Sequence, residues 1–149
     1  MQIVETISDE RIAGRQQLAS LERRLGGRLP DDYVAFLLRS NGGRADGSSF
    51  DFADHTGETT SSRVAWFFGL STDDSYGLEA NLDDYAGRIP TGFCPIGCDP
   101  FGNALLLAVG GKHYGSVWFW DHEHEREEPD LSNMSRVANS FQDFIQALR

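Results

Sequence analysis

Two histidines lie in a short run of acids in the last third of the sequence. His122 and His124 alternate with acidic residues within 121–125, so both imidazoles project from one side of an extended chain. A structural zinc site takes four ligands and a catalytic site takes three, and the nearest further histidine, His113, lies on a separate turn. A metal-dependent hydrolase built on these three histidines is one hypothesis. A solvated acidic loop is the simpler interpretation, and we expect no metal.

Other residues that could carry chemistry are present without a catalytic arrangement. Cys94 and Cys98 form a C-x-x-x-C pair, which we interpret as two buried thiols. No phosphate-binding, dinucleotide-binding or nucleophile-elbow glycine motif occurs. Acid/base hydrolysis needs carboxylates that face each other across a cleft, whereas the pairs here are adjacent in sequence, at 31–32, 73–74, 83–84 and 127–128. These residues therefore indicate no specific catalytic or cofactor site.

The tryptophans leave two interpretations open. Trp118 and Trp120 share one face of a predicted strand, while Val117 and Phe119 share the other. Core packing is the first interpretation. The second is a partly exposed recognition surface, because Trp and Tyr are enriched at the energetic centres of interfaces. In that case an acidic rim would be supplied by Asp73, Asp74 and Asp99, beside Tyr76.

The periodicity of apolar residues predicts helices in the N-terminal part of the chain and mainly strands after it. Leucines at helical spacing indicate a helix over 9–25, and Pro30 opens a second helix that ends at Asn41-Gly42-Gly43. Residues 44–62 suit either a hairpin or a loop, and 78–87 suit a short helix. Strands are expected at 64–70, 93–97, 103–109 and 116–120, the last three as an antiparallel meander whose middle strand is covered on both faces. Residues 136–149 predict a closing helix with Ser135 as its N-cap.

Length and charge limit the class of protein. A chain of 149 residues suits one domain, here 1–149, and has no apolar run long enough for a membrane span. The net charge of -10 is unevenly placed, with +1 over residues 1–44 and -11 over residues 45–149. Binding to nucleic acid depends on clustered Lys and Arg, so a basic protein partner is expected instead. The start of the chain lacks a signal sequence, and a cytosolic location is expected.

Several segments in this order resemble the SUKH superfamily, in the branch named for the fungal cell-wall synthesis regulator. The resemblance covers nearly the whole chain, and it rests on LGGRLPDDYVAFLLRSNGG (25–43), FFGL (67–70), IPTGFCPIGCDPFGNALLLAV (89–109), GSVWFWDHE (115–123) and VANSFQDFIQAL (137–148). It implies an α+β domain in which a curved antiparallel sheet of about five to six strands packs with N-terminal helices and a C-terminal helix. Segment 44–62 matches no feature of the family.

For bacterial single-domain members the resemblance also implies an immunity protein. Such a protein binds a cognate toxin, commonly a nuclease or another nucleic-acid-directed enzyme, and blocks it. The resemblance also implies a family that is not enzymatic, so we expect no enzyme activity and no cofactor. We expect occlusion by an acidic surface of a monomer or weak homodimer, without binding to nucleic acid or membrane. The alternative is a regulatory adaptor of the same fold with no toxin. The candidate contacts are Asp73, Asp74, Tyr76, Asp99, Asp121, Glu123, Glu125, Glu127 and Glu128.

Overall fold

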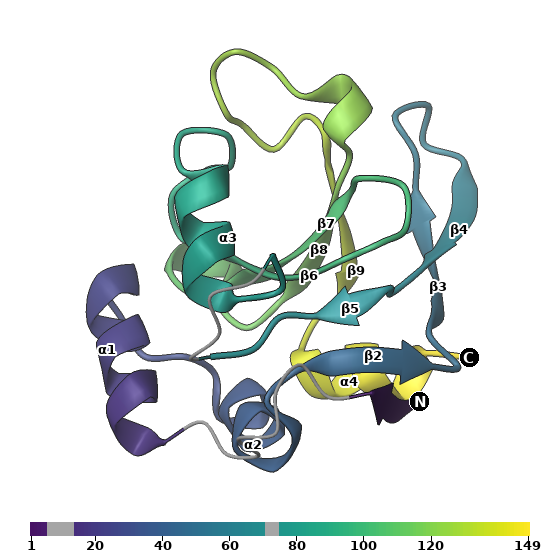
Figure 1. Ribbon diagram of the computed structural model, residues 1–149. Coiled ribbons are helices and arrows are strands. Elements are labelled where there is room, and N and C mark those ends of the chain that lie inside the picture. The colour runs from purple at the N-terminus through teal and green to yellow at the C-terminus, as the bar shows by residue number, and fades with distance from the viewer. Residues whose placement is uncertain (6–13, 71–74) are drawn as a thin grey trace.

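A seven-stranded antiparallel sheet forms the centre of the protein (Figure 1). The computed structural model describes residues 1–5, 14–70 and 75–149. In spatial order the strands are β1 (Gln2–Glu5), β2 (Gly43–Asp46), β5 (Trp66–Phe67), β6 (Phe93–Cys98), β7 (Ala104–Ala108), β8 (Val117–Trp120) and β9 (Met134–Ala138). The α+β fold class and the β6–β8 meander are confirmed, and the sheet has more strands than the five to six expected.

A separate hairpin accounts for much of the polar segment that the sequence left open. Strands β3 (Ser49–Ala53) and β4 (Thr59–Arg63) pair over their full length and form a second, two-stranded sheet. Phe50 and Phe52 anchor it, with the Phe52 ring stacked on Phe119 of β8 at 3.9 Å between centroids. The hairpin is therefore attached to the domain by aromatic packing and leaves its tip in solvent.

Four helices complete the described fold: α1 (Arg15–Leu25), α2 (Asp31–Ser40), α3 (Leu78–Tyr85) and α4 (Phe141–Ala147). The buried residues of α1, α2 and α4 belong to one core on the first face of the sheet. On the second face, Tyr85 at the end of α3 and Ile89 pack against a smaller core. None of the described helices is long and apolar enough to cross a bilayer.

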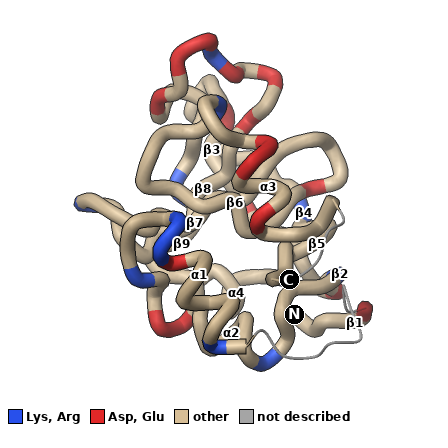
Figure 2. The backbone as a smooth tube through the Cα atoms, turned by 60° about the vertical axis from the view of Figure 1, so that its left-hand side comes forward, with Lys and Arg blue, Asp and Glu red and all other residues tan. Residues whose placement is uncertain are grey.

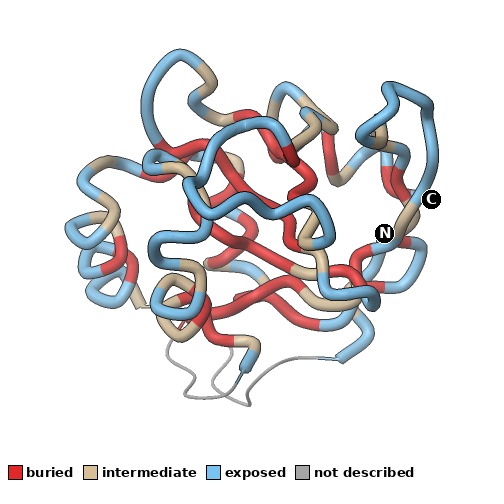
Figure 3. The backbone as a smooth tube through the Cα atoms, turned by 90° about the horizontal axis from the view of Figure 1, so that it is seen from above, coloured by how far each residue is buried: buried red, intermediate tan, exposed pale blue. Residues whose placement is uncertain are grey.

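Alternation along β7 and β8 divides the apolar side chains between the two faces. Val117 and Phe119 enter the larger core, whereas Trp118 and Trp120 enter the smaller one together with Leu106. All residues of β7 are buried. The structure therefore confirms that the middle strand is covered on both faces, and it supports core packing for Trp118 and Trp120. Buried stretches of the backbone lie mainly in the middle of the molecule, with exposed loops around them (Figure 3).

The turn after α2 explains the Asn-Gly-Gly sequence. Asn41 is in the left-handed conformation at φ 46°, and its side chain pairs with both backbone groups of Leu70, at 2.8 and 3.0 Å. A Cβ at Gly42 would lie 2.6 Å from the carbonyl oxygen of Phe67, and one at Gly69 would lie 2.3 Å from that of Asn41. Glycine is needed here because two backbone segments touch.

The C-terminal prediction was wrong over its first five residues, 136–140. Residues 134–138 form the edge strand β9, because they hydrogen-bond to β8, and the helix begins only at Phe141. Ser140 is its N-cap and accepts a hydrogen bond from the Asp143 amide at 3.0 Å, whereas Ser135 accepts one from Ala53 of the hairpin. Val137 lies four residues before Phe141, which matches the spacing of apolar residues on one face of a helix, although Val137 is part of a strand.

Two other boundaries differ from the sequence prediction. Within 64–70 the strand is only Trp66–Phe67, which pairs with β2 and β6, and the flanking Ala65 and Phe68 amides donate to β6 carbonyls at 2.8 Å. In the first predicted helix the described part begins at Arg15, after Gly14 as N-cap, and the stretch 9–13 lies outside the described residues.

Candidate partner-binding surface

The acidic loop, residues 121–130, projects from one end of the protein between β8 and β9 (Figure 1). It holds six carboxylates and one arginine, and every residue from Glu123 to Asp130 is exposed. Figure 2 shows several acidic residues at this end with a basic one among them, and further acidic and basic residues along the rest of the chain. Part of the uneven charge along the sequence is thus gathered in this one exposed loop.

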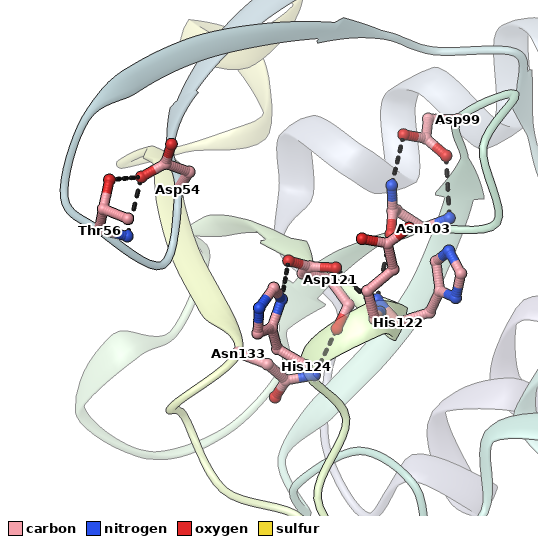
Figure 4. A network of polar contacts seen from close by, with 9 residues as sticks. Asp54, Thr56, Asp99, Asn103, Asp121, His122, His124 and Asn133 are labelled. Carbon is pink, nitrogen blue, oxygen red and sulfur yellow. Dashed lines mark hydrogen bonds and ion pairs between the residues drawn. The ribbon is translucent and has the colours of Figure 1, made fainter.

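Hydrogen bonds hold the base of the acidic loop in place (Figure 4). Asp121 caps a short 3-10 helix, His122–His124, by accepting from the Glu123 amide at 2.9 Å. Its backbone is tied to Asn133, at the end of the connection, by two bonds of 2.9 Å. The Asn103 side chain accepts from the His122 amide at 3.0 Å. Because Asp121 is half-buried and committed to these contacts, it supports the loop from within the fold.

Asp99 has an internal position in the β6–β7 turn. It is 6% exposed, and its carboxylate accepts hydrogen bonds of 2.8 to 2.9 Å from the amides of Phe101 and Asn103, the Asn103 side chain and the Ser62 hydroxyl. These contacts position Asn103, which in turn holds His122. The structure therefore places Asp99 behind the acidic loop, and we leave it out of the proposed contact surface.

Glu125 is joined to the rest of the domain by Arg88. Arg88 Nε and Nη2 donate to the two Glu125 carboxylate oxygens at 3.0 and 2.9 Å. The guanidinium carbon lies 5.1 Å from the ring centre of Tyr85 and 5.4 Å from that of Trp120, within the range of cation–π attraction. Hydrogen bonds from Arg88 lower the pKa of Glu125 below its ordinary value. The middle of the acidic loop is thus held against the second core.

The remaining loop carboxylates are available to a partner. Glu123, Glu127 and Glu128 are exposed and make no ion pair or side-chain hydrogen bond with any described residue. At the end of the loop, Asp130 forms a 3.7 Å ion pair with Arg126. The three glutamates therefore supply the loop's free negative charge.

The tip of the β3–β4 hairpin extends this surface. His55 stacks on His124 of the acidic loop at 4.2 Å between ring centres, which places Asp54 and Glu58 beside the loop. A small hollow of about 30 Å³ is lined by both segments, His55 and His124 included. Hydrogen bonds from Thr56 and Glu58 lower the pKa of Asp54. Sequence reasoning missed these two acids because only the fold brings the hairpin to the loop.

Tyr76, another predicted contact, lies away from the acidic loop, against Trp66. Tyr76 is half-buried, with its ring stacked on Trp66 at 4.3 Å between centres. Asp73 and Asp74 lie outside the described residues. Among the described residues the structure therefore brings together the predicted contacts of the acidic loop, 121–128, and places Asp99 and Tyr76 apart from them.

The three histidines of the hydrolase hypothesis have different surroundings. His113 Nδ1 lies 2.7 Å from Arg136, His124 Nδ1 lies 2.7 Å from Asp121, and His122 packs against Gly102. Among the described residues no group of three histidine, cysteine or acidic side chains is arranged to hold a metal ion. Cys94 is buried and Cys98 is half-buried, both as free thiols, and burial raises their pKa values to about 12 and about 11.

The fold and the sequence agree on one class of protein. Residues 13–147 match the SMI1 / KNR4 family (SUKH-1), so the chain belongs to this family. It is also similar to the SPbeta prophage-derived uncharacterized protein YokK of Bacillus subtilis (strain 168). The two are 28% identical over 148 residues, which cover 89% of this chain and 73% of the relative.

Proposed function

We propose that this chain is a cytoplasmic immunity protein that binds and occludes a cognate polymorphic or contact-dependent toxin. Membership of the SMI1 / KNR4 family fits an immunity-type role, and the family is generally non-enzymatic. The observation that carries the proposal is the acidic loop, which exposes three free glutamates on a base held by hydrogen bonds. A basic substrate-binding surface, such as that of a nuclease, is its natural complement.

Charge complementarity gives the proposed mechanism. Clustered carboxylates steer a basic partner and raise its association rate, and the effect weakens as salt screens the charges. A loop already held in its bound shape loses little conformational freedom on binding. The toxin is then inhibited because its substrate-binding surface is covered, and this requires no catalytic group.

Co-expression tests the proposal. The toxin domain encoded by a neighbouring reading frame is expressed in cells with and without this protein, and the purified pair is tested for capture at about 50 and 500 mM salt. Rescue of growth and capture that weakens at high salt are expected. Growth arrest despite expression of the protein, together with absence of capture, contradicts the proposal and favours the adaptor without a toxin.

A further inference from the structure

An apolar groove of about 330 Å³ lies between the end of α1, α3 and the segment that follows α3. This volume is within the range of small ligand pockets, roughly 300 to 1,000 Å³. Its large apolar lining residues are Leu25, Leu82, Tyr85, Ile89, Pro90 and Phe93. Each of the six is half-buried, so the partly exposed apolar area is gathered on one surface. Such a gathered patch marks an interaction site, unlike single exposed hydrophobic residues.

The walls of the groove are held by the rest of the fold. Tyr85 packs edge-on against Trp120 at 5.4 Å between ring centres, and Phe93 packs edge-on against Trp118 at 5.8 Å. An ion pair between Arg24 of α1 and Asp83 of α3 joins the two helices at the rim. The groove is therefore already formed in the free protein, which reduces the entropy cost of filling it.

The charges around the groove identify the kind of partner. Its two basic neighbours, Arg24 and Arg88, are each paired with a carboxylate, of Asp83 and Glu125 respectively. Asp84 is exposed and has no ion pair among the described residues. The rim is thus net negative, and through Glu125 it is continuous with the acidic loop. The complementary partner is a polypeptide segment that presents an apolar side chain among Lys or Arg residues.

We infer that this groove receives an apolar side chain from the basic surface of the toxin. The inference rests on the proposed function, and it assigns different roles in binding to the acidic loop and to the groove. The acidic loop controls the rate of association, whereas the filled groove controls the rate of dissociation. A desolvated apolar contact beside a charged rim is the usual composition of an interface centre.

Filling the groove tests the inference without removing a core residue. Ala86 is exposed, lines the groove and has a negative φ of -57° that Trp also adopts, so Ala86→Trp places an indole in the space. Thr91→Trp does the same from the opposite segment. Ala35→Trp, at an exposed position on α2, is the matched control. The probe is the purified toxin domain of the neighbouring reading frame, with its activity removed by substitution, and kinetics are measured by surface plasmon resonance.

For Ala86→Trp and Thr91→Trp the dissociation rate constant is expected to rise about tenfold or more, with little change in the association rate constant. Ala35→Trp is expected to match the unsubstituted protein, and circular dichroism and the melting temperature verify that all three fold. Tight binding by both groove variants at an unchanged dissociation rate overturns the inference and leaves the proposed function standing. Absence of binding by the unsubstituted protein overturns both.

Discussion

Alkaline destabilisation provides a quantitative test of the packing around Cys94. The thiol is completely buried, and burial raises its pKa from the ordinary 9.0 to about 12. Between these two values the unfolded chain loses the thiol proton while the folded chain keeps it. The unfolded state then binds fewer protons, so stability falls as the pH rises above about 9.

The size of the effect follows from the two pKa values. Each pH unit in this window corresponds to about 1.4 kcal/mol for one fully ionised thiol. Between pH 8 and pH 10, Cys94 alone is therefore expected to lower the free energy of unfolding by about 1.4 kcal/mol. Cys98 and Tyr33 act in the same direction, because burial raises their pKa values too.

A comparison with Cys94→Ala isolates the contribution of Cys94. Urea unfolding is measured at pH 8 and pH 10 for both proteins, and the other groups that titrate cancel in the difference. The substituted protein starts less stable but is expected to lose about 1.4 kcal/mol less over the interval. If both proteins lost the same free energy of unfolding between pH 8 and pH 10, the conclusion that the Cys94 thiol is buried and neutral would be refuted.

Three further outcomes are expected. Asp99→Ala should lower the free energy of unfolding, measured in urea, by about 3 kcal/mol, because four hydrogen bonds to a buried carboxylate are lost. A loss below about 1 kcal/mol would contradict a structural role for this carboxylate. Ser140→Ala should lower the free energy of unfolding by about 1 kcal/mol, because the N-cap hydrogen bond of α4 is lost. Ser20→Ala, at an exposed position on α1, is the control and should change it very little, and equal effects of the two substitutions would argue against a helix that begins at Phe141. In the native protein at pH 8, Cys94 should resist Ellman's reagent for as long as the chain stays folded, and rapid labelling would contradict its burial.

The local signals in the sequence were sufficient for the central meander. Apolar runs separated by Asp99-Pro100 and by paired glycines predicted β6 to β8, and the alternation of Trp118 with Phe119 assigned the two faces of β8 correctly. These features depend on short-range turn chemistry and on a period of two. They can therefore be predicted without any knowledge of the tertiary structure.

The edge strands and the hairpin depend on partners that are distant in sequence. β9 was mistaken for helix because Val137 matches both a strand and a helical stripe, and only pairing with β8 decides between them. The short β1 and β5 give too few residues for a periodic signal. Tertiary pairing overrides local propensity in such segments.

The candidate surface was predictable where charge alone decides exposure. Glu123, Glu127 and Glu128 were expected in solvent and are exposed. Asp99 was predicted to lie in a turn, but it was also expected to be exposed to a partner, whereas its carboxylate is buried by hydrogen bonds to the following amides. The groove could not be predicted from the sequence, since α1 and α3 are brought together only by the fold.

The central claim is that the acidic loop steers a basic toxin. The most direct measurement is the association rate constant with the inactivated toxin domain, for the unsubstituted protein and for Glu123→Gln/Glu127→Gln/Glu128→Gln. A control carries three exposed acids neutralised away from the loop, Asp31→Asn/Asp46→Asn/Asp143→Asn.

At about 50 mM salt we expect the loop variant to associate roughly tenfold more slowly than the control, with the difference shrinking at about 500 mM. Equal association rates for the loop variant and the control at both salt concentrations would contradict the claim.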